Sequence, residues 1–215
     1  MEYKNRIADK LLRDKLEAMG AVLIEGPKAC GKTTTAEQQA KSIIYMDDPV
    51  KQEQYKQMAQ TNIRFLLEGE TPRLIDEWQH VPQFWDAIRF EVDHRDDDGQ
   101  FMLTGSAVPA DMKEIHHTGT GRYGWLTMRP MSLWESGEST GEVSLSDLFL
   151  TPDRIGALNK LTLPMLAFAA CRGGWPKSLQ KKTEKAALSQ VTEYYKAITN
   201  SDISRVDNVK RDEER

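Results

Sequence analysis

Two spacings of apolar residues alternate along the chain as far as residue 135. Short continuous apolar runs are separated by longer stretches in which apolar residues recur every three or four positions. The continuous runs are typical of strands buried on both faces, and the longer spacing is typical of helices with one buried face. The runs predict five strands, at residues 21–24, 43–46, 73–77, 100–105 and 125–129.

The helical spacing predicts helices before and between these strands. They are expected at residues 7–19, 34–41, 50–67 and 82–94. Gly20 ends the first helix and Pro82 begins the last, because glycine favours the position after a helix and proline favours its first turn. Strands that alternate with helices form a parallel sheet through right-handed crossovers, so the predicted fold class is α/β.

After residue 135 the strand pattern fades. Residues 145–150, 158–170 and 185–198 instead have the composition and spacing of helices. We therefore expect two parts, a core at residues 1–135 and a helical region at residues 136–215. Residues 205–215 are mostly charged, which is unusual for the end of a folded domain, and we interpret the chain as truncated.

Length, charge and cysteine content narrow the class of protein. A chain of 215 residues is long enough for one α/β domain with a small helical addition. The net charge is −4 with both signs mixed, so no broad basic surface for nucleic acid is expected. Two distant cysteines, a polar N-terminus and the lack of any apolar run of membrane-spanning length indicate a cytoplasmic protein.

A glycine-rich segment follows the first predicted strand and satisfies the pattern G-x-x-x-x-G-K-[ST]. Its glycines let backbone N–H groups turn toward phosphate oxygens, its lysine neutralises phosphate charge, and its threonine hydroxyl ligates Mg²⁺. The segment predicts a site for ATP and Mg²⁺ in a P-loop NTPase fold, a three-layer sandwich. The expected nucleotide contacts are Gly26, Pro27, Lys28, Ala29, Cys30, Gly31, Lys32, Thr33 and Thr34, with Thr33 also a metal ligand.

Two carboxylates end the third predicted strand. Asp76 is expected to hold Mg²⁺, and Glu77 to orient and deprotonate the water that attacks the γ-phosphate. Any apolar strand can end in Asp-Glu, so the pair alone is a weak signal for a catalytic site. The position about 45 residues after a phosphate-binding loop favours the catalytic interpretation, in which the segment is a Walker B strand.

The fourth predicted strand, residues 100–105, ends in Thr104 and Gly105 and is followed by Ser106. In ATPases with such a glutamate, a strand inserted between the phosphate-loop strand and the Walker B strand has its polar tip at the γ-phosphate. We therefore expect the strand order 5-1-4-3-2, with Thr104 or Ser106 positioning the attacking water. An ordinary turn is the alternative for Ser106.

Other polar residues give weaker signals. Arg122 precedes the fifth strand, where its guanidinium would neutralise γ-phosphate charge within its own chain or in a neighbouring copy, although a surface arginine is equally consistent. His116 and His117 lack further ligands at metal-binding spacing, and residues 96–99 indicate a solvated turn. Cys30 is expected to be a small loop residue and not a redox switch.

Four stretches together resemble a known family, the bacterial and archaeal AAA-type ATPases whose P-loop domain precedes a nuclease-like domain of unknown function. The matching stretches are residues 23–28 with 31–35, 74–79 with 82, 103–106, and 121–122 before 129–133. The resemblance covers about residues 1–200, and the nuclease-like domain does not fit in the remainder. The resemblance implies that ATP hydrolysis drives a conformational switch. For full-length relatives it also implies nucleic acid or protein clients. Residues 173–176 also resemble the Gly-x-Pro element of switch-type ATPases, which implies that Pro176 lies near the nucleotide base.

Two functions of different classes fit these features. One is an ATPase that uses hydrolysis as a conformational switch and is able to self-associate, and Glu77 favours it. The other is a module that holds ATP or ADP with negligible turnover, which the absent C-terminal half favours. A small-molecule kinase is disfavoured, because the Walker B strand carries its own expected base and no arginine-rich lid is evident.

Overall fold

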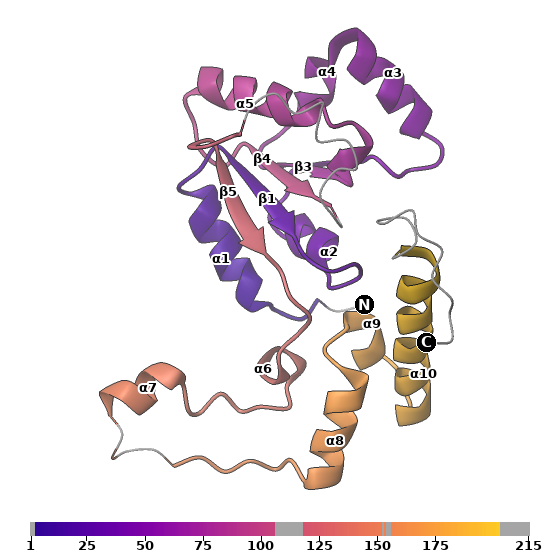
Figure 1. Ribbon diagram of the computed structural model, residues 1–215. Coiled ribbons are helices and arrows are strands. Elements are labelled where there is room, and N and C mark those ends of the chain that lie inside the picture. Colours follow the sequence, from indigo (N-terminus) through magenta and orange to yellow (C-terminus); the bar gives the residue numbers. More distant parts are fainter. Residues whose placement is uncertain (1–2, 106–117, 152, 154–155, 203–215) are drawn as a thin grey trace. The chain divides into compact units, whose positions relative to one another are not determined.

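The computed structural model describes residues 3–105, 118–151, 153 and 156–202 (Figure 1). The chain forms two compact units, Met1–Arg129 and Pro130–Arg215. The boundary expected from the sequence lies between residues 135 and 136. The P-loop and the Asp-Glu pair both belong to the first unit.

A five-stranded, all-parallel sheet forms the centre of the first unit. The strands are β1 (Ala21–Glu25), β2 (Ser42–Tyr45), β3 (Arg73–Asp76), β4 (Phe101–Thr104) and β5 (Tyr123–Thr127). Their order is β2-β3-β4-β1-β5, and every neighbouring pair is parallel. This is the predicted order 5-1-4-3-2 counted from the other edge, so the predicted sheet is confirmed. All carboxyl ends of the strands therefore share one edge.

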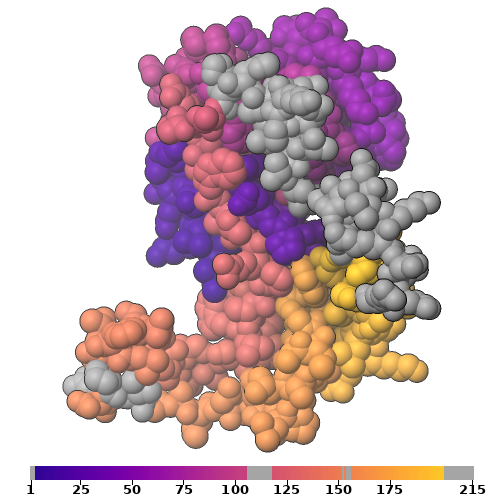
Figure 2. Space-filling view, in the orientation of Figure 1, coloured from indigo at the N-terminus to yellow at the C-terminus, as the bar shows by residue number. Residues whose placement is uncertain are grey.

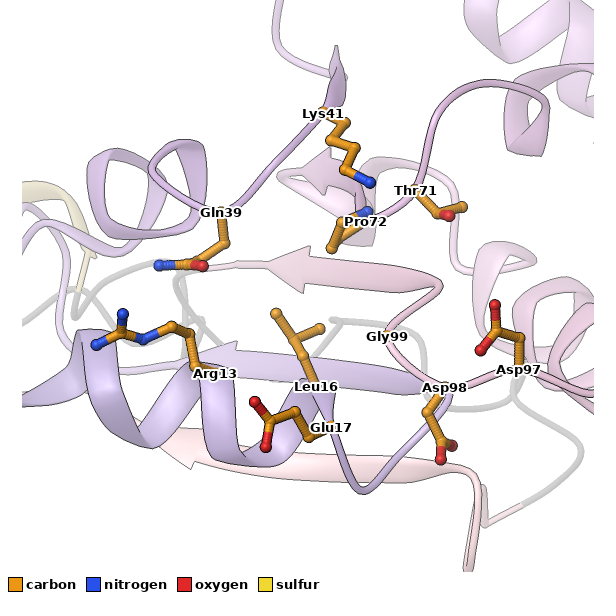
Figure 3. Close-up of a pocket in the computed structure, with 10 residues that line it drawn as sticks. All are labelled: Arg13, Leu16, Glu17, Gln39, Lys41, Thr71, Pro72, Asp97, Asp98 and Gly99. Carbon is orange, nitrogen blue, oxygen red and sulfur yellow. The ribbon is translucent and has the colours of Figure 1, made fainter.

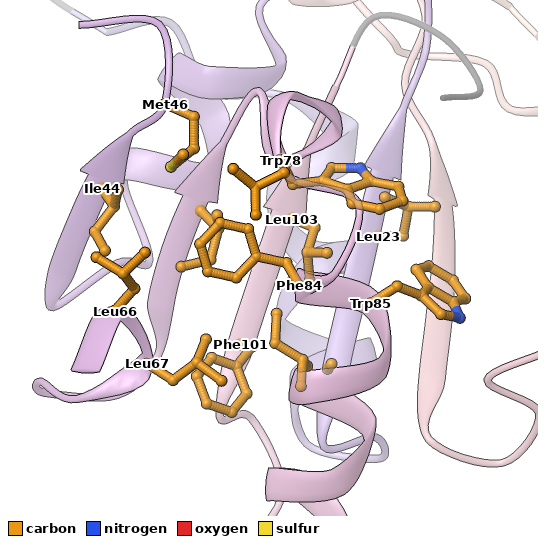
Figure 4. Close-up of a cluster of buried hydrophobic side chains, with 14 of the residues drawn as sticks. Leu23, Ile44, Met46, Leu66, Leu67, Trp78, Phe84, Trp85, Phe101 and Leu103 are labelled. Atoms are coloured by element: carbon orange, nitrogen blue, oxygen red, sulfur yellow. The ribbon is translucent and has the colours of Figure 1, made fainter. Parts of the chain in front are cut away.

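Helices cover both faces of the sheet. They are α1 (Ile7–Leu16), α2 (Lys32–Glu37), α3 (Gln52–Asn62), α4 (Arg64–Leu67) and α5 (Phe84–Arg95), with a 3₁₀ turn, η1, at Trp78–His80. Leu23, Ile75 and Leu103 belong to one apolar cluster with the helical residues Leu66 and Phe84 (Figure 4). Successive strand residues point to opposite faces, and α1 and α2 contact the strands on the other side. The three-layer sandwich is thus confirmed.

Three predicted elements differ from the structure in extent. The helix expected at residues 50–67 is two helices, separated at Ile63, where the Asn62 side chain accepts the Arg64 N–H at 3.1 Å. The fifth strand begins at Tyr123 instead of residue 125, since Tyr123 and Gly124 already pair with β1. The helix expected to reach residue 41 ends at Glu37.

The second unit is helical in its described part. It contains α6 (Leu133–Ser136), α7 (Leu145–Leu150), α8 (Leu163–Arg172), α9 (Pro176–Leu179), α10 (Glu184–Ala197) and a π-helical turn, η4, at Ile198–Asp202. Arg172 forms a two-bond ion pair with Glu138, at 2.7 and 2.9 Å. Gly174 packs against the backbone of Met131, whose carbonyl oxygen would lie 2.0 Å from an added Cβ. The apolar side chains of α7 are exposed, and they belong to Leu145, Leu148, Phe149 and Leu150. Figure 2 shows atoms of this segment at the surface of the molecule.

No helix in the described part of either unit combines the length and the apolar composition that crossing a membrane requires.

Helix α5 offers a direct test of this packing. Phe84 is fully buried and Phe90, on the same helix, is 38% exposed. Phe84→Ala should lower the free energy of unfolding by about 3–5 kcal/mol, because it removes a core ring and leaves a cavity. Phe90→Ala is the matched control and should cost about 1 kcal/mol or less. Urea unfolding measures both, and equal losses would contradict the described core.

Candidate functional site

The glycine-rich loop connects β1 to α2 at the carboxyl edge of the sheet. Gly26, Ala29 and Gly31 adopt positive φ angles of 147°, 61° and 104°. A Cβ on Gly26 would lie 2.1 Å from the Met128 carbonyl oxygen, so only glycine fits there. The loop is therefore packed closely against the chain that leaves β5. Pro27, Lys28, Ala29 and Thr34 are exposed, and Cys30 is fully buried.

Lys32 is the cation of this loop. Its Nζ atom donates hydrogen bonds to the carbonyl oxygens of Gly26 at 2.9 Å and Pro27 at 3.0 Å. The residue is only 6% exposed. The carbonyl oxygens of the loop thus hold the buried ammonium group, as the burial of a charge requires.

Asp76 joins the loop to the sheet. Its Oδ1 atom accepts hydrogen bonds from the Thr33 hydroxyl at 2.7 Å and from the Thr104 hydroxyl at 2.5 Å. These residues come from β3, α2 and β4, and they meet because Asp76 and Thr104 are partners in the register of two parallel strands. The structure therefore brings together three of the residues predicted from separate motifs.

The electrostatic environment of Asp76 is unfavourable for its charge. Burial raises the pKa of this carboxyl above its usual range, the Thr104 and Thr33 hydroxyls oppose the shift, and the nearby Asp47 and Glu37 carboxylates add to it. A carboxylate and a hydroxyl are the hard oxygen ligands that Mg²⁺ prefers. The group thus fits Mg²⁺, which would offset the buried negative charge. In the described residues no cluster of three or more His, Cys, Asp or Glu offers a different metal site.

Glu77 follows β3 directly and has a left-handed backbone with φ of 54°. Its Oε2 atom accepts a hydrogen bond from the side-chain amide of Gln79. The Oε1 atom of Gln79 is buried and has no hydrogen-bond partner among the described residues. Gln79 lies within the stretch 74–79 that carries the family resemblance, but the sequence assigned it no role.

The remaining predicted site residues differ in what the structure shows of them. The Thr104 hydroxyl is occupied by Asp76, while Ser106, His116 and His117 lie outside the described residues. Pro176 begins α9 in the second unit, and its expected position near the nucleotide base stays a prediction. Burial raises the pKa of the Cys30 thiol, which favours the interpretation of Cys30 as a small loop residue.

Arg122 lies at the opposite edge of the sheet. Its carbonyl accepts a hydrogen bond from the N–H of Ala21, at the start of β1, whereas the phosphate-binding loop follows the end of β1. That strand separates the two by roughly 16 Å. The guanidinium instead pairs with Asp93 of α5, at 2.7 Å. The interpretation of Arg122 as a γ-phosphate contact within its own chain is therefore wrong, because the strand direction carries it away.

A hollow of about 420 Å³ lies at the amino edge of the sheet (Figure 3). It contains cations such as Arg13 and Lys41 together with carboxylates such as Glu17 and Asp97. The charges in this hollow have both signs. Because the hollow lies at the amino edge, it is separate from Lys32, Thr33 and Asp76 at the carboxyl edge.

The chain is similar to known proteins in sequence and in structure. Residues 19–136, more than half of the chain, match the sequence model of a family described as an AAA domain. Among solved structures the chain is similar to C. elegans PCH-2, with 16% identity and a TM-score of 0.43. The alignment covers 87% of this chain and 66% of that one, so this chain spans less than two thirds of the length of PCH-2. No curated protein sequence matches the chain.

The buried charge of Asp76 gives a prediction about stability. Its pKa is raised in the folded state, so the stability linked to this group is present at acid pH and is lost as the pH rises through the folded pKa. Asp76→Asn removes the charge and keeps an oxygen that accepts both hydroxyls. At neutral pH this variant should melt above the wild type without ligand, yet gain no stability from Mg·ATP. The exposed Asp98→Asn is the control, and a lower melting temperature for Asp76→Asn would contradict the prediction.

Proposed function

Because the chain belongs to the AAA domain family, we propose that it binds ATP with Mg²⁺ and hydrolyses the bond between the β- and γ-phosphates. The observation that carries the proposal is that the hydroxyls of Thr33 and Thr104 both donate to the Asp76 carboxylate. Lys32 directly precedes Thr33 in the chain. Motifs far apart in sequence thereby form one group with the chemistry that a metal-bound triphosphate requires.

Each residue has a distinct part in this proposal. Backbone N–H groups of the loop and the Lys32 ammonium bind phosphate oxygens, while Thr33 and Asp76 hold the metal ion. When bound, Mg²⁺ neutralises charge on the phosphates. Glu77 accepts a proton from the water whose oxygen attacks the γ-phosphorus, and the bond to the ADP oxygen breaks. Thr104 fixes the direction of the Asp76 carboxylate through its hydrogen bond.

Two contacts support a conformational change that accompanies binding. Lys32 has to exchange the carbonyls of Gly26 and Pro27 for phosphate oxygens. Glu77 has to exchange the Gln79 amide for water. Both changes occur in the loops at the carboxyl edge of the sheet, so nucleotide state and loop conformation are coupled, which is what a switch requires.

A nucleotide-binding module with negligible turnover is the second candidate. The hydrogen bond from Gln79 favours it, because this contact occupies the carboxylate that hydrolysis needs. The two candidates differ in phosphate release and share ATP binding. A role for Arg122 at the γ-phosphate now requires a neighbouring copy of the chain, and it stays a prediction, as do the cytoplasmic location and any nucleic acid or protein client.

Lys32→Ala tests nucleotide binding. For the wild type, Mg·ATP at 100 times Kd should add about 2.7 kcal/mol of stability, or roughly 5–10 °C in melting temperature. Lys32→Ala should lose this shift because the phosphate charge is no longer neutralised. Lys41→Ala, an exposed lysine at the amino edge, is the control and should keep it. Scanning fluorimetry measures all three proteins, and a wild type that does not shift would overturn the assignment.

Glu77→Gln separates hydrolysis from binding. An amide cannot accept the proton of the attacking water, so phosphate release should fall by about 10²-fold or more while the thermal shift with Mg·ATP persists. Glu68→Gln changes an exposed glutamate and serves as the control. A colorimetric phosphate assay measures the rates. Wild-type turnover in Glu77→Gln would mean that the base lies elsewhere, and no release from the wild type would favour the binding module.

A further inference from the structure

Residues near the N-terminus contact the phosphate-binding loop, although they precede the stretch that matches the family. The Tyr3 hydroxyl donates a hydrogen bond to Asp9 at 2.5 Å and lies 3.0 Å from the hydroxyl of Thr35, a buried residue of α2. Asp9 also accepts the backbone N–H of Arg6 at 2.7 Å, which fixes the start of α1. The segment before α1 is thereby attached to the helix that follows the loop.

Arg6 makes the most direct of these contacts. The residue is 7% exposed, and its Nη1 atom donates to the carbonyl oxygen of Cys30 at 2.9 Å. Its Nη2 atom donates to the carbonyl oxygen of Arg129 at 2.7 Å. One buried guanidinium therefore ties the middle of the phosphate-binding loop to the chain that leaves β5.

The contact with Cys30 fixes a peptide plane. In a trans peptide the carbonyl and the next N–H lie in one plane and point in opposite directions. Since Arg6 holds the Cys30 carbonyl on its own side, the N–H of Gly31 is directed to the other side. Gly31 has a φ of 104°. Because glycine has no side chain, its backbone is free to adopt many orientations unless something holds it.

We propose that Arg6 is a positioning residue for the triphosphate, which it serves by holding the 30–31 peptide with its N–H toward the phosphates. The proposal rests on the nucleotide binding proposed above. It adds a residue outside the P-loop and Walker B motifs, and it makes the segment before α1 part of the binding apparatus. The guanidinium also adds a positive charge behind the loop, which favours an anion in front of it.

Arginine suits this position better than lysine. A planar guanidinium presents several N–H groups in a fixed fork, so it reaches two carbonyls at once, whereas an ammonium on a flexible stem does not hold both in one geometry. Arg6→Lys should therefore have an intermediate effect. It also provides a variant that keeps the charge and most of the side-chain packing if Arg6→Ala folds poorly.

The test measures binding of ATP and of inorganic tripolyphosphate, both with Mg²⁺, by calorimetry at a temperature where circular dichroism shows each protein folded. Tripolyphosphate has no base or sugar, so it reports the phosphate-binding loop alone. Arg6→Ala should weaken both ligands by about 10- to 100-fold, the effect of losing a charged hydrogen bond. Arg13→Ala, an exposed arginine of α1, is the matched control. Added guanidinium ion should restore part of the affinity of Arg6→Ala.

Each outcome decides the proposal. Equal loss for both ligands, an intermediate loss in Arg6→Lys and rescue by guanidinium would support it. Wild-type affinity in both Arg6 variants, even with a lower melting temperature, would overturn it and leave Arg6 a purely structural role. Loss for ATP alone would also overturn it, since Arg6 would then act on the base or sugar. A wild type that binds neither ligand would instead refute the proposed nucleotide binding itself.

Discussion

The carboxylate of Asp76 is the point on which the candidate site depends. It is buried at the end of a central strand, and in the part of the chain that the structure describes its side chain accepts hydrogen bonds from two hydroxyls, those of Thr33 and Thr104. A buried carboxylate in this state costs free energy in the protein alone. A divalent cation between Asp76 and Thr33 would reverse that cost. The burial that disfavours the Asp76 charge without ligand therefore favours the binding of Mg·ATP. The burial of Asp76 thus links the stability of the domain to its proposed chemistry.

The phosphate-binding loop is shaped from outside as much as by its own sequence. Gly26 fits because the Met128 carbonyl leaves no space for a side chain. The Cys30 carbonyl is held by Arg6. All these contacts involve backbone atoms, whose directions decide where the loop N–H groups point. A loop supported in this way pays little conformational entropy when it binds phosphate.

The sequence predicted those features that follow from local pattern and strand direction. Five strands, their order and the meeting of Thr33 with Asp76 all follow from motifs attached to parallel strands. The error over Arg122 had the same source, since a residue that precedes a parallel strand must lie at the amino edge, away from a loop that follows one. Arg6 and Gln79 were not predictable. Their roles come from side chains that reach other segments, which no local spacing encodes.

Calorimetric titration of the wild-type chain with ATP, first in Mg²⁺ and then in EDTA, tests the central claim most directly. The account predicts saturable binding at a single site that requires the metal, because Asp76 and Thr33 hold the nucleotide through it. It also predicts that Asp76→Asn abolishes the difference between the two titrations. Binding of equal strength in Mg²⁺ and EDTA, or no binding in either, would contradict the account.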